Sequence, residues 1–228
     1  MLNENKLNQR MVFLMESGFF GKKILKEEML SSEEVENLKR LINSGDPINV
    51  EMAFNIASGH PDIEMEILKH WLSLLVDIED LDDLQKLSLE DYNLKFLPES
   101  IGSLTNLKEL NLGYNKFTSL PESFGKLTSL EELWVYQNNL TSLPEWIGGL
   151  TGLKKLSFSH NQLTTISDSI GSLTNLKELH LHVNQLTVLP DSIGSLTSLK
   201  RLSLYGNPLP SEEKEKIEGM LPNCDINF

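Results

Sequence analysis

A leucine recurs every 23 residues through the second half of the chain, and this fixed period restricts the possible folds more than any other feature. Six copies share the pattern L-x-x-L-x-L/V/F-x-x-N-x-L/F, in which Tyr92 replaces the asparagine of the first copy. The leucines that open the copies are Leu84, Leu107, Leu130, Leu153, Leu176 and Leu199. A period of this size is typical of chains built from stacked supersecondary units.

The first part of each copy predicts a short β-strand. Apolar residues such as Leu87 and Leu89 alternate there with polar ones, so one face of the strand is apolar. One such strand is not stable alone, but stacked copies pair as a parallel sheet and bury a continuous core. We expect strands near residues 86–90, 109–113, 132–136, 155–159, 178–182 and 201–205. The repeated asparagine is expected to satisfy backbone groups where the chain turns off the strand.

The second part of each copy predicts a 3₁₀ helix or a single helical turn. It reads L-P-E-S-I-G at residues 97–102, where proline fixes φ, the acid suits a helix N-terminus and glycine ends the turn. The apolar residue before the glycine is expected to point into the core. This column comprises Ile101, Phe124, Ile147, Ile170 and Ile193.

The complete unit, L-P-x-x-I-G-x-L-x-x-L-x-x-L-x-L-x-x-N-x-L, resembles the leucine-rich-repeat family. It is most similar to the 23-residue intracellular and bacterial subtype, and the resemblance covers residues 84–209. It implies an α/β fold, a right-handed solenoid with a parallel concave sheet and short 3₁₀ turns on the convex side. A resemblance of this kind indicates a fold and leaves the function to be argued from the site.

The two ends of the repeat array are expected to carry caps, because an open solenoid exposes its terminal core. Residues 1–80 do not repeat and predict an α-helical N-terminal cap or small helical domain, of which we favour the cap. Ser31-x-x-Glu34 is a capping-box pattern at the start of one helix. Two further helices are predicted over residues 48–57 and 63–76.

Residues 81–228 are predicted to form the solenoid, which ends in a C-terminal cap at 210–228. Ser211 is the expected N-cap of a helix over residues 212–220. The chain then closes the sheet edge, with Ile226 and Phe228 facing inward. Cys224 is interpreted as a buried residue of this cap and not as a nucleophile.

Charge and composition argue against several classes of function. The chain has 33 acidic and 20 basic residues, a formal charge of −13, so we expect neither nucleic acid nor an anionic membrane as partner. No apolar run approaches the ~20 residues of a membrane span, and the run at 11–15 is too short for a signal peptide. These features predict a soluble, cytoplasmic monomer.

The sequence contains no motif that indicates catalysis or a cofactor. It has no nucleotide-binding glycine loop, no G-x-S-x-G elbow and no H-E-x-x-H pair. The acids of the 3₁₀ turns recur with the repeat, so helix N-termini explain them better than paired catalytic carboxylates do. We therefore predict a protein that is not an enzyme and needs no cofactor.

The residues that the repeat leaves free are the candidates for function. Trp134 and Tyr136 leave the same face of one strand, and nothing in the fold requires large aromatic side chains there. Tyrosine and tryptophan are enriched in protein-binding hot spots. We predict that a protein or peptide binds the concave face, with an apolar or aromatic anchor beside a lysine or arginine. The predicted contact residues are Trp134, Tyr136, Tyr114, His160, His180, His182, Tyr205, Glu109 and Glu132.

Three alternatives remain open from the sequence alone. The family includes small secreted members, so the chain could be a host-directed bacterial effector. His160, His180 and His182 could hold a zinc ion with one open position, although no carboxylate other than Glu178 supports them. Trp146, on the convex side, is either exposed and supports a second contact or folds down onto the next repeat.

Overall fold

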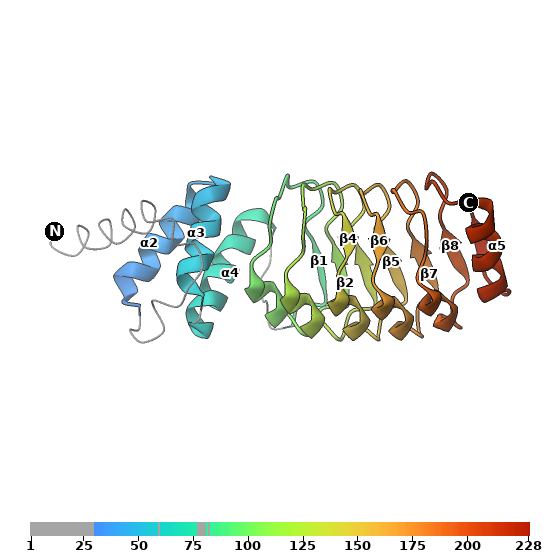
Figure 1. Ribbon diagram of the computed structural model, residues 1–228. Helices are drawn as coiled ribbons and strands as arrows, with labels where there is room; N and C mark the ends of the chain where they lie inside the picture. Colours follow the sequence, from blue (N-terminus) through green and yellow to red (C-terminus); the bar gives the residue numbers. More distant parts are fainter. Residues whose placement is uncertain (1–29, 59, 77–80, 82) are drawn as a thin grey trace. The chain divides into compact units, whose positions relative to one another are not determined.

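The computed structural model describes residues 30–58, 60–76, 81 and 83–228. The chain divides into two compact units, Met1–Trp71 and Leu72–Phe228. The part of the predicted helical segment that precedes residue 30 lies outside the described residues. Among the described residues, no helix is long and apolar enough to cross a membrane. Figure 1 shows the helices and the stacked repeats along the chain.

Among the described residues, three helices precede the repeats: α2 (Ser32–Asn43), α3 (Pro47–Ala57) and α4 (Pro61–Leu75). The predicted capping box is confirmed, because the backbone N–H of Glu34 donates to Ser31 Oγ over 3.3 Å and the N–H of Ser31 donates to the Glu34 carboxylate over 2.8 Å. Within the first unit, the rings of Phe54 and Trp71 meet edge to face with centroids 5.6 Å apart. The role of residues 1–80 as a cap or as a separate domain stays a prediction.

The repeats build one parallel sheet in the order β1-β2-β3-β5-β7-β8-β9. Its strands are β1 (Lys86–Ser88), β2 (Glu109–Asn111), β3 (Glu132–Trp134), β5 (Lys155–Ser157), β7 (Glu178–His180), β8 (Arg201–Ser203) and β9 (Asp225–Asn227). Leu87 pairs with Leu110 and Leu110 with Leu133, so the predicted 23-residue register is confirmed. A second, two-stranded sheet joins β4 (Ser142–Leu143) to β6 (Thr165–Ile166).

The predicted single helical turns are also confirmed. They are η1 (Glu99–Ser103), η2 (Glu122–Lys126), η3 (Glu145–Gly149), η4 (Asp168–Ser172) and η5 (Asp191–Ser195). Every residue of the predicted inward column, from Ile101 to Ile193, is fully buried. The core therefore lies between the sheet and these turns, and the outer face of the sheet is left to side chains that the fold does not need.

The repeated asparagines satisfy buried backbone groups, as predicted. Asn138 shows the pattern: its Nδ2 donates to the carbonyls of Leu112, Val135 and Tyr136 over 3.0–3.3 Å, and its Oδ1 accepts from the N–H of Phe117 over 3.0 Å. The same side chain thus links its own repeat to the one before it. The equivalent residues Asn115, Asn161, Asn184 and Asn207 make the matching bonds.

The C-terminal cap consists of α5 (Ser211–Met220) and β9, which pairs with β8. The prediction that Ser211 is the N-cap is wrong. Extended backbone ends one residue earlier, at Pro210, so Ser211 already lies in the helix and no side chain caps its start. Ile226 and Phe228 are partly buried, and Lys214 Nζ lies 5.3 Å from the centroid of the Phe228 ring. Burial raises the pKa of the partly buried Cys224 thiol, which disfavours its thiolate form.

Candidate functional site on the concave face

The candidate site begins where each strand ends, in a column of left-handed residues. Asp91, Tyr114, Gln137, His160, Val183 and Gly206 all have φ between 53° and 73°. This conformation is uncommon for residues other than glycine, and it turns the chain off the sheet. The strands therefore end two residues earlier than predicted. Tyr114 and His160 accordingly project from a turn.

Tyr136 is fixed across the sheet. Its hydroxyl donates to Glu90 Oε1 over 2.6 Å, and Asn111 Nδ2 donates to the other oxygen of Glu90 over 2.8 Å. Partial burial raises the pKa of Tyr136, and the bond to the Glu90 carboxylate adds to that shift. Gly113 leaves room for the ring, because a Cβ built there would lie 2.5 Å from Tyr136 Cζ. The tyrosine is thus held in place before any partner arrives.

The predicted aromatic residues form a nearly continuous series of ring contacts. Tyr114 meets Tyr136 edge to face at 5.4 Å, and Trp134 stacks on His180 at 6.3 Å, both measured between ring centroids. Ser157, on the strand between Trp134 and His180, is predicted by the strand alternation to face solvent. It is buried instead, because the two large rings meet above it.

The three histidines lie together at the other end of this series. The ring of His182 meets that of His160 at 5.3 Å and that of His180 at 6.1 Å, and it stacks on Tyr205 at 4.5 Å. The Nδ1 atom of His182 is buried and has no hydrogen-bond partner. Burial lowers the pKa of His182, and the neighbouring His160 and His180 lower it further. The neutral imidazole is therefore the favoured form of His182.

The alternative of a metal site finds no support in the structure. Among the described residues, no group of three histidine, cysteine or acidic side chains is arranged to hold a metal ion. Nε2 of His180 lies 3.6 Å from the Glu178 carboxylate, and His182 stacks flat on Tyr205. These rings are engaged with other partners and do not converge on one point.

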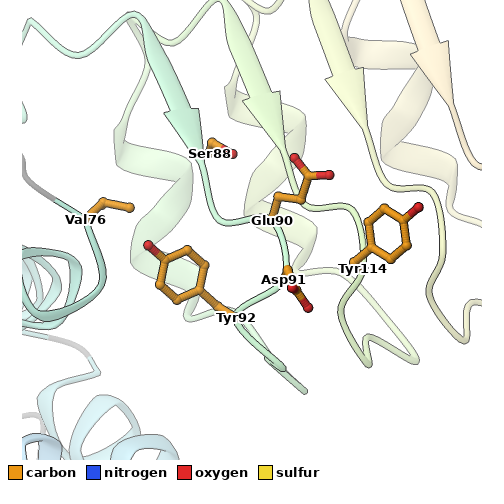
Figure 2. Close-up of a pocket in the computed structure, with 6 residues that line it drawn as sticks. All are labelled: Val76, Ser88, Glu90, Asp91, Tyr92 and Tyr114. Carbon is orange, nitrogen blue, oxygen red and sulfur yellow. The ribbon is translucent and has the colours of Figure 1, made fainter.

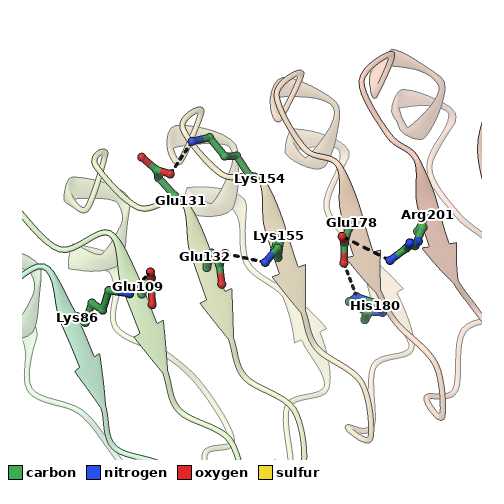
Figure 3. A network of polar contacts seen from close by, with 9 residues as sticks. All are labelled: Lys86, Glu109, Glu131, Glu132, Lys154, Lys155, Glu178, His180 and Arg201. Carbon is green, nitrogen blue, oxygen red and sulfur yellow. Dashed lines mark hydrogen bonds and ion pairs between the residues drawn. The ribbon is translucent and has the colours of Figure 1, made fainter.

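A row of ion pairs crosses the strands beside the aromatic rings (Figure 3). Lys86 pairs with Glu109 at 2.6 Å, Lys155 with Glu132 at 2.8 Å, and Arg201 with Glu178 at 3.7 Å. Glu109 and Glu132 therefore each have a lysine beside them. The negative charge that the sequence places next to the aromatics is largely neutralised within the sheet itself.

A hollow of about 610 Å³ lies at the start of the repeat sheet (Figure 2). It is lined by Val76, Ser88, Glu90, Asp91, Tyr92 and Tyr114. Of these residues, only Tyr114 is among the contact residues predicted from the sequence. The sequence did mark this place, because Tyr92 replaces the repeated asparagine in the first copy. The hydroxyl of Tyr92 donates to the backbone carbonyl of Leu75 instead.

Trp146 packs on the preceding repeat, whereas the packing that the sequence suggests is on the next one. Its ring lies 5.3 Å from that of Phe124, and the residue is partly buried. Its indole Nε1 is buried without a hydrogen-bond partner. Trp146 therefore contributes to the packing of the convex side.

Comparison with known proteins agrees with this architecture. Residues 105–148 match a family model described as "Leucine Rich repeats (2 copies)", and residues 135–186 and 153–209 match "Leucine rich repeat". No curated protein matches the chain. Many solved structures do match it.

Three of these matching structures differ in source and in the share of each chain that the match covers. The plant peptide hormone receptor RGFR1, in complex with RGF2, is 31% identical, with a TM-score of 0.56 over 64% of this chain and 24% of that chain. The Arabidopsis receptor kinase HAESA, in complex with the peptide hormone IDA and the co-receptor SERK1, is 37% identical, with a TM-score of 0.51 over 56% and 22%. A leucine-rich-repeat protein of Leptospira interrogans is 31% identical, with a TM-score of 0.46 over 72% and 51%.

The chain thus spans about half or less of the length of these solved chains. The residues that the family models match lie within the segment that forms the parallel sheet of stacked 23-residue units. The chain is a leucine-rich-repeat protein.

Proposed function

We propose that this chain is a non-enzymatic interaction module that binds an extended segment of a partner protein on the concave face of its repeat sheet. Leucine-rich-repeat domains generally serve as protein-interaction modules. The observation that carries the proposal is the series of aromatic rings across this face: Tyr114, Tyr136, Trp134, His180, His182 and Tyr205. Two similar solved receptors are in complex with peptide hormones, RGF2 and IDA.

The aromatic face is pre-organised, which favours binding. The hydrogen bond to Glu90 and the close packing of the ring over Gly113 fix Tyr136. Stacking with His180 supports Trp134. A partner that meets side chains already held in one conformation loses less conformational entropy on association. The neighbouring ion pairs leave little unpaired charge beside Trp134, so apolar and aromatic contact is expected to supply most of the affinity there.

The test compares two tryptophans on opposite sides of the repeat unit. Peptides that bind the full chain are selected from a displayed library, and their affinity is measured by calorimetry. Trp134→Ala is expected to weaken binding by ~2 kcal/mol or more, a factor of about 30 in Kd. Trp146→Ala is the matched control, because it removes an equally large ring from the convex side. Loss of binding in Trp146→Ala with full binding in Trp134→Ala would reject the concave face.

The proposal also takes the chain to act as a monomer in the cytoplasm. Light scattering of the free protein and of its complex with a selected peptide measures the first point. Cell fractionation tests the second.

A further inference from the structure

We propose that the hollow beside β1 receives an arginine side chain of the segment that binds the concave face. This inference rests on the proposed function and adds to it the chemistry and position of one partner residue. The hollow combines two features that suit an arginine, exposed aromatic faces and carboxylate oxygens that can accept further hydrogen bonds, within one set of adjoining residues.

Two tyrosines supply the aromatic faces. Tyr92 is 38% exposed and Tyr114 is 52% exposed, although both rings are large and apolar. Figure 2 shows them on either side of Glu90 and Asp91. A planar guanidinium can stack on such a ring, and a cation within ~6 Å of the ring centroid is attracted to its face. The same rings can cover the methylene groups of the arginine stem.

The carboxylates of Glu90 and Asp91 can accept hydrogen bonds from a side chain of a partner. Glu90 is held by the Tyr136 hydroxyl and Asn111 Nδ2, two neutral donors that leave its negative charge in place. An ionised carboxylate has about four acceptor positions, so Glu90 can accept further hydrogen bonds. Asp91 is exposed, and within the described part of the chain its carboxylate has no ion-pair or hydrogen-bond partner.

Negative charge without a basic neighbour lies at the β1 end of the concave face, which favours an arginine there. On the strands, Glu109 and Glu132 are each paired with a lysine, and Glu178 lies beside Arg201 and His180. Glu90 and Asp91 have no such basic neighbour among the described residues. The chain carries a formal charge of −13, and its field favours the approach of a basic segment.

The position of the hollow also predicts a spacing in the partner. Trp134 on β3 lies two strands from β1, and neighbouring strands are ~4.8 Å apart, which gives about 10 Å across the sheet. An extended chain advances ~3.3 Å per residue, so about three residues would span this distance. We expect arginine about three residues from the apolar or aromatic residue that contacts Trp134.

The test uses N-acetyl-arginine amide as the probe and N-acetyl-citrulline amide as its uncharged counterpart. Each is titrated into the full chain, and backbone amide shifts are followed by NMR. The arginine probe is expected to shift Asp91, Tyr92 and Tyr114, and the citrulline probe is expected to leave them unchanged. Equal shifts from both probes, or arginine-dependent shifts located elsewhere, would overturn the proposal.

A pair of matched variants tests the carboxylate. Asp91→Asn removes the charge and keeps a residue that tolerates the left-handed backbone, and it is expected to raise the Kd of the arginine probe at least about threefold. Asp168→Asn removes an exposed acid from η4 and is expected to leave the Kd unchanged. Equal Kd values for Asp91→Asn and the unmodified chain would reject the site.

This inference and the proposed function fail in different ways. If selected peptides need Trp134 but bind Asp91→Asn as tightly as the unmodified chain, the arginine site is wrong and the concave face stands. If the arginine probe occupies the hollow but selected peptides bind Trp134→Ala as tightly as the unmodified chain, the arginine site stands and the proposal of the aromatic face is wrong.

Discussion

The substitution Leu156→Ala removes a side chain at the centre of the repeat core, and its cost in unfolding free energy can be worked out from the structure. Leu156 is fully buried on β5, and its strand neighbours Leu133 and Leu179 are fully buried as well. Leucine-to-alanine changes in cores cost ~2–5 kcal/mol, and the cost grows with the volume of the cavity that remains. Here the strand is hydrogen-bonded on both sides, so the backbone cannot move in to fill the space. We therefore expect a loss near the upper half of that range, ~3–5 kcal/mol.

The assay is urea unfolding followed by circular dichroism, analysed by the midpoint at constant slope. Val188→Ala is the control, because Val188 lies in the same compact unit, Leu72–Phe228, and the residue is 48% exposed. It is expected to shift stability by no more than ~0.5 kcal/mol. A Leu156→Ala midpoint close to that of Val188→Ala would refute the assignment of Leu156 to the core.

Three further predictions test the buried polar groups and the site. Asn138→Ala leaves several buried backbone groups without a partner, so a loss of more than about 2 kcal/mol is expected in urea unfolding, whereas Asn139→Ala should be nearly neutral. Gly113→Ala places a Cβ against Tyr136 and is expected to change the near-UV tyrosine signal and weaken peptide binding; an unchanged signal would contradict the described packing. The lowered pKa of His182 means that the unfolded chain binds its proton more readily, so stability should fall as pH drops below the unfolded value of about 6.5. His182→Phe should reduce the loss of melting temperature between pH 7.5 and 5.5, and an NMR titration that places the pKa of His182 above its unfolded value would contradict the sign.

The register of the fold was predictable because the repeat determines it. A strict 23-residue period aligns Leu87, Leu110 and Leu133 in one column, and a slip of one residue would expose every leucine of a strand. The ends of the strands were less predictable. Tyr114, Gln137 and Val183 adopt a left-handed conformation that their side chains do not favour, so local preference gave no signal. The asparagine that follows each of these three residues fixes this backbone through bonds to adjacent repeats.

The candidate site was predictable as a set of positions and much less as a set of contacts. Glu109 and Glu132 were expected to offer free charge, but each meets a lysine from the adjacent strand. Ser157 was expected to face solvent, but two neighbouring rings meet above it. Both outcomes depend on side-chain rotamers across neighbouring strands, which the alternation of a single strand does not specify. The hollow beside Tyr92 depends in addition on Val76, which precedes the repeats.

The footprint of a bound peptide, recorded by NMR cross-saturation from the peptide to the amides of the full chain, tests binding on the concave face most directly. Binding on this face predicts that saturation reaches the outer face of β3, β5 and β7, with Trp134, Tyr136 and His180 among the most affected residues. It predicts no transfer to η3, where Trp146 lies. A footprint centred on Trp146, or on α2 and α3, would contradict binding on the concave face.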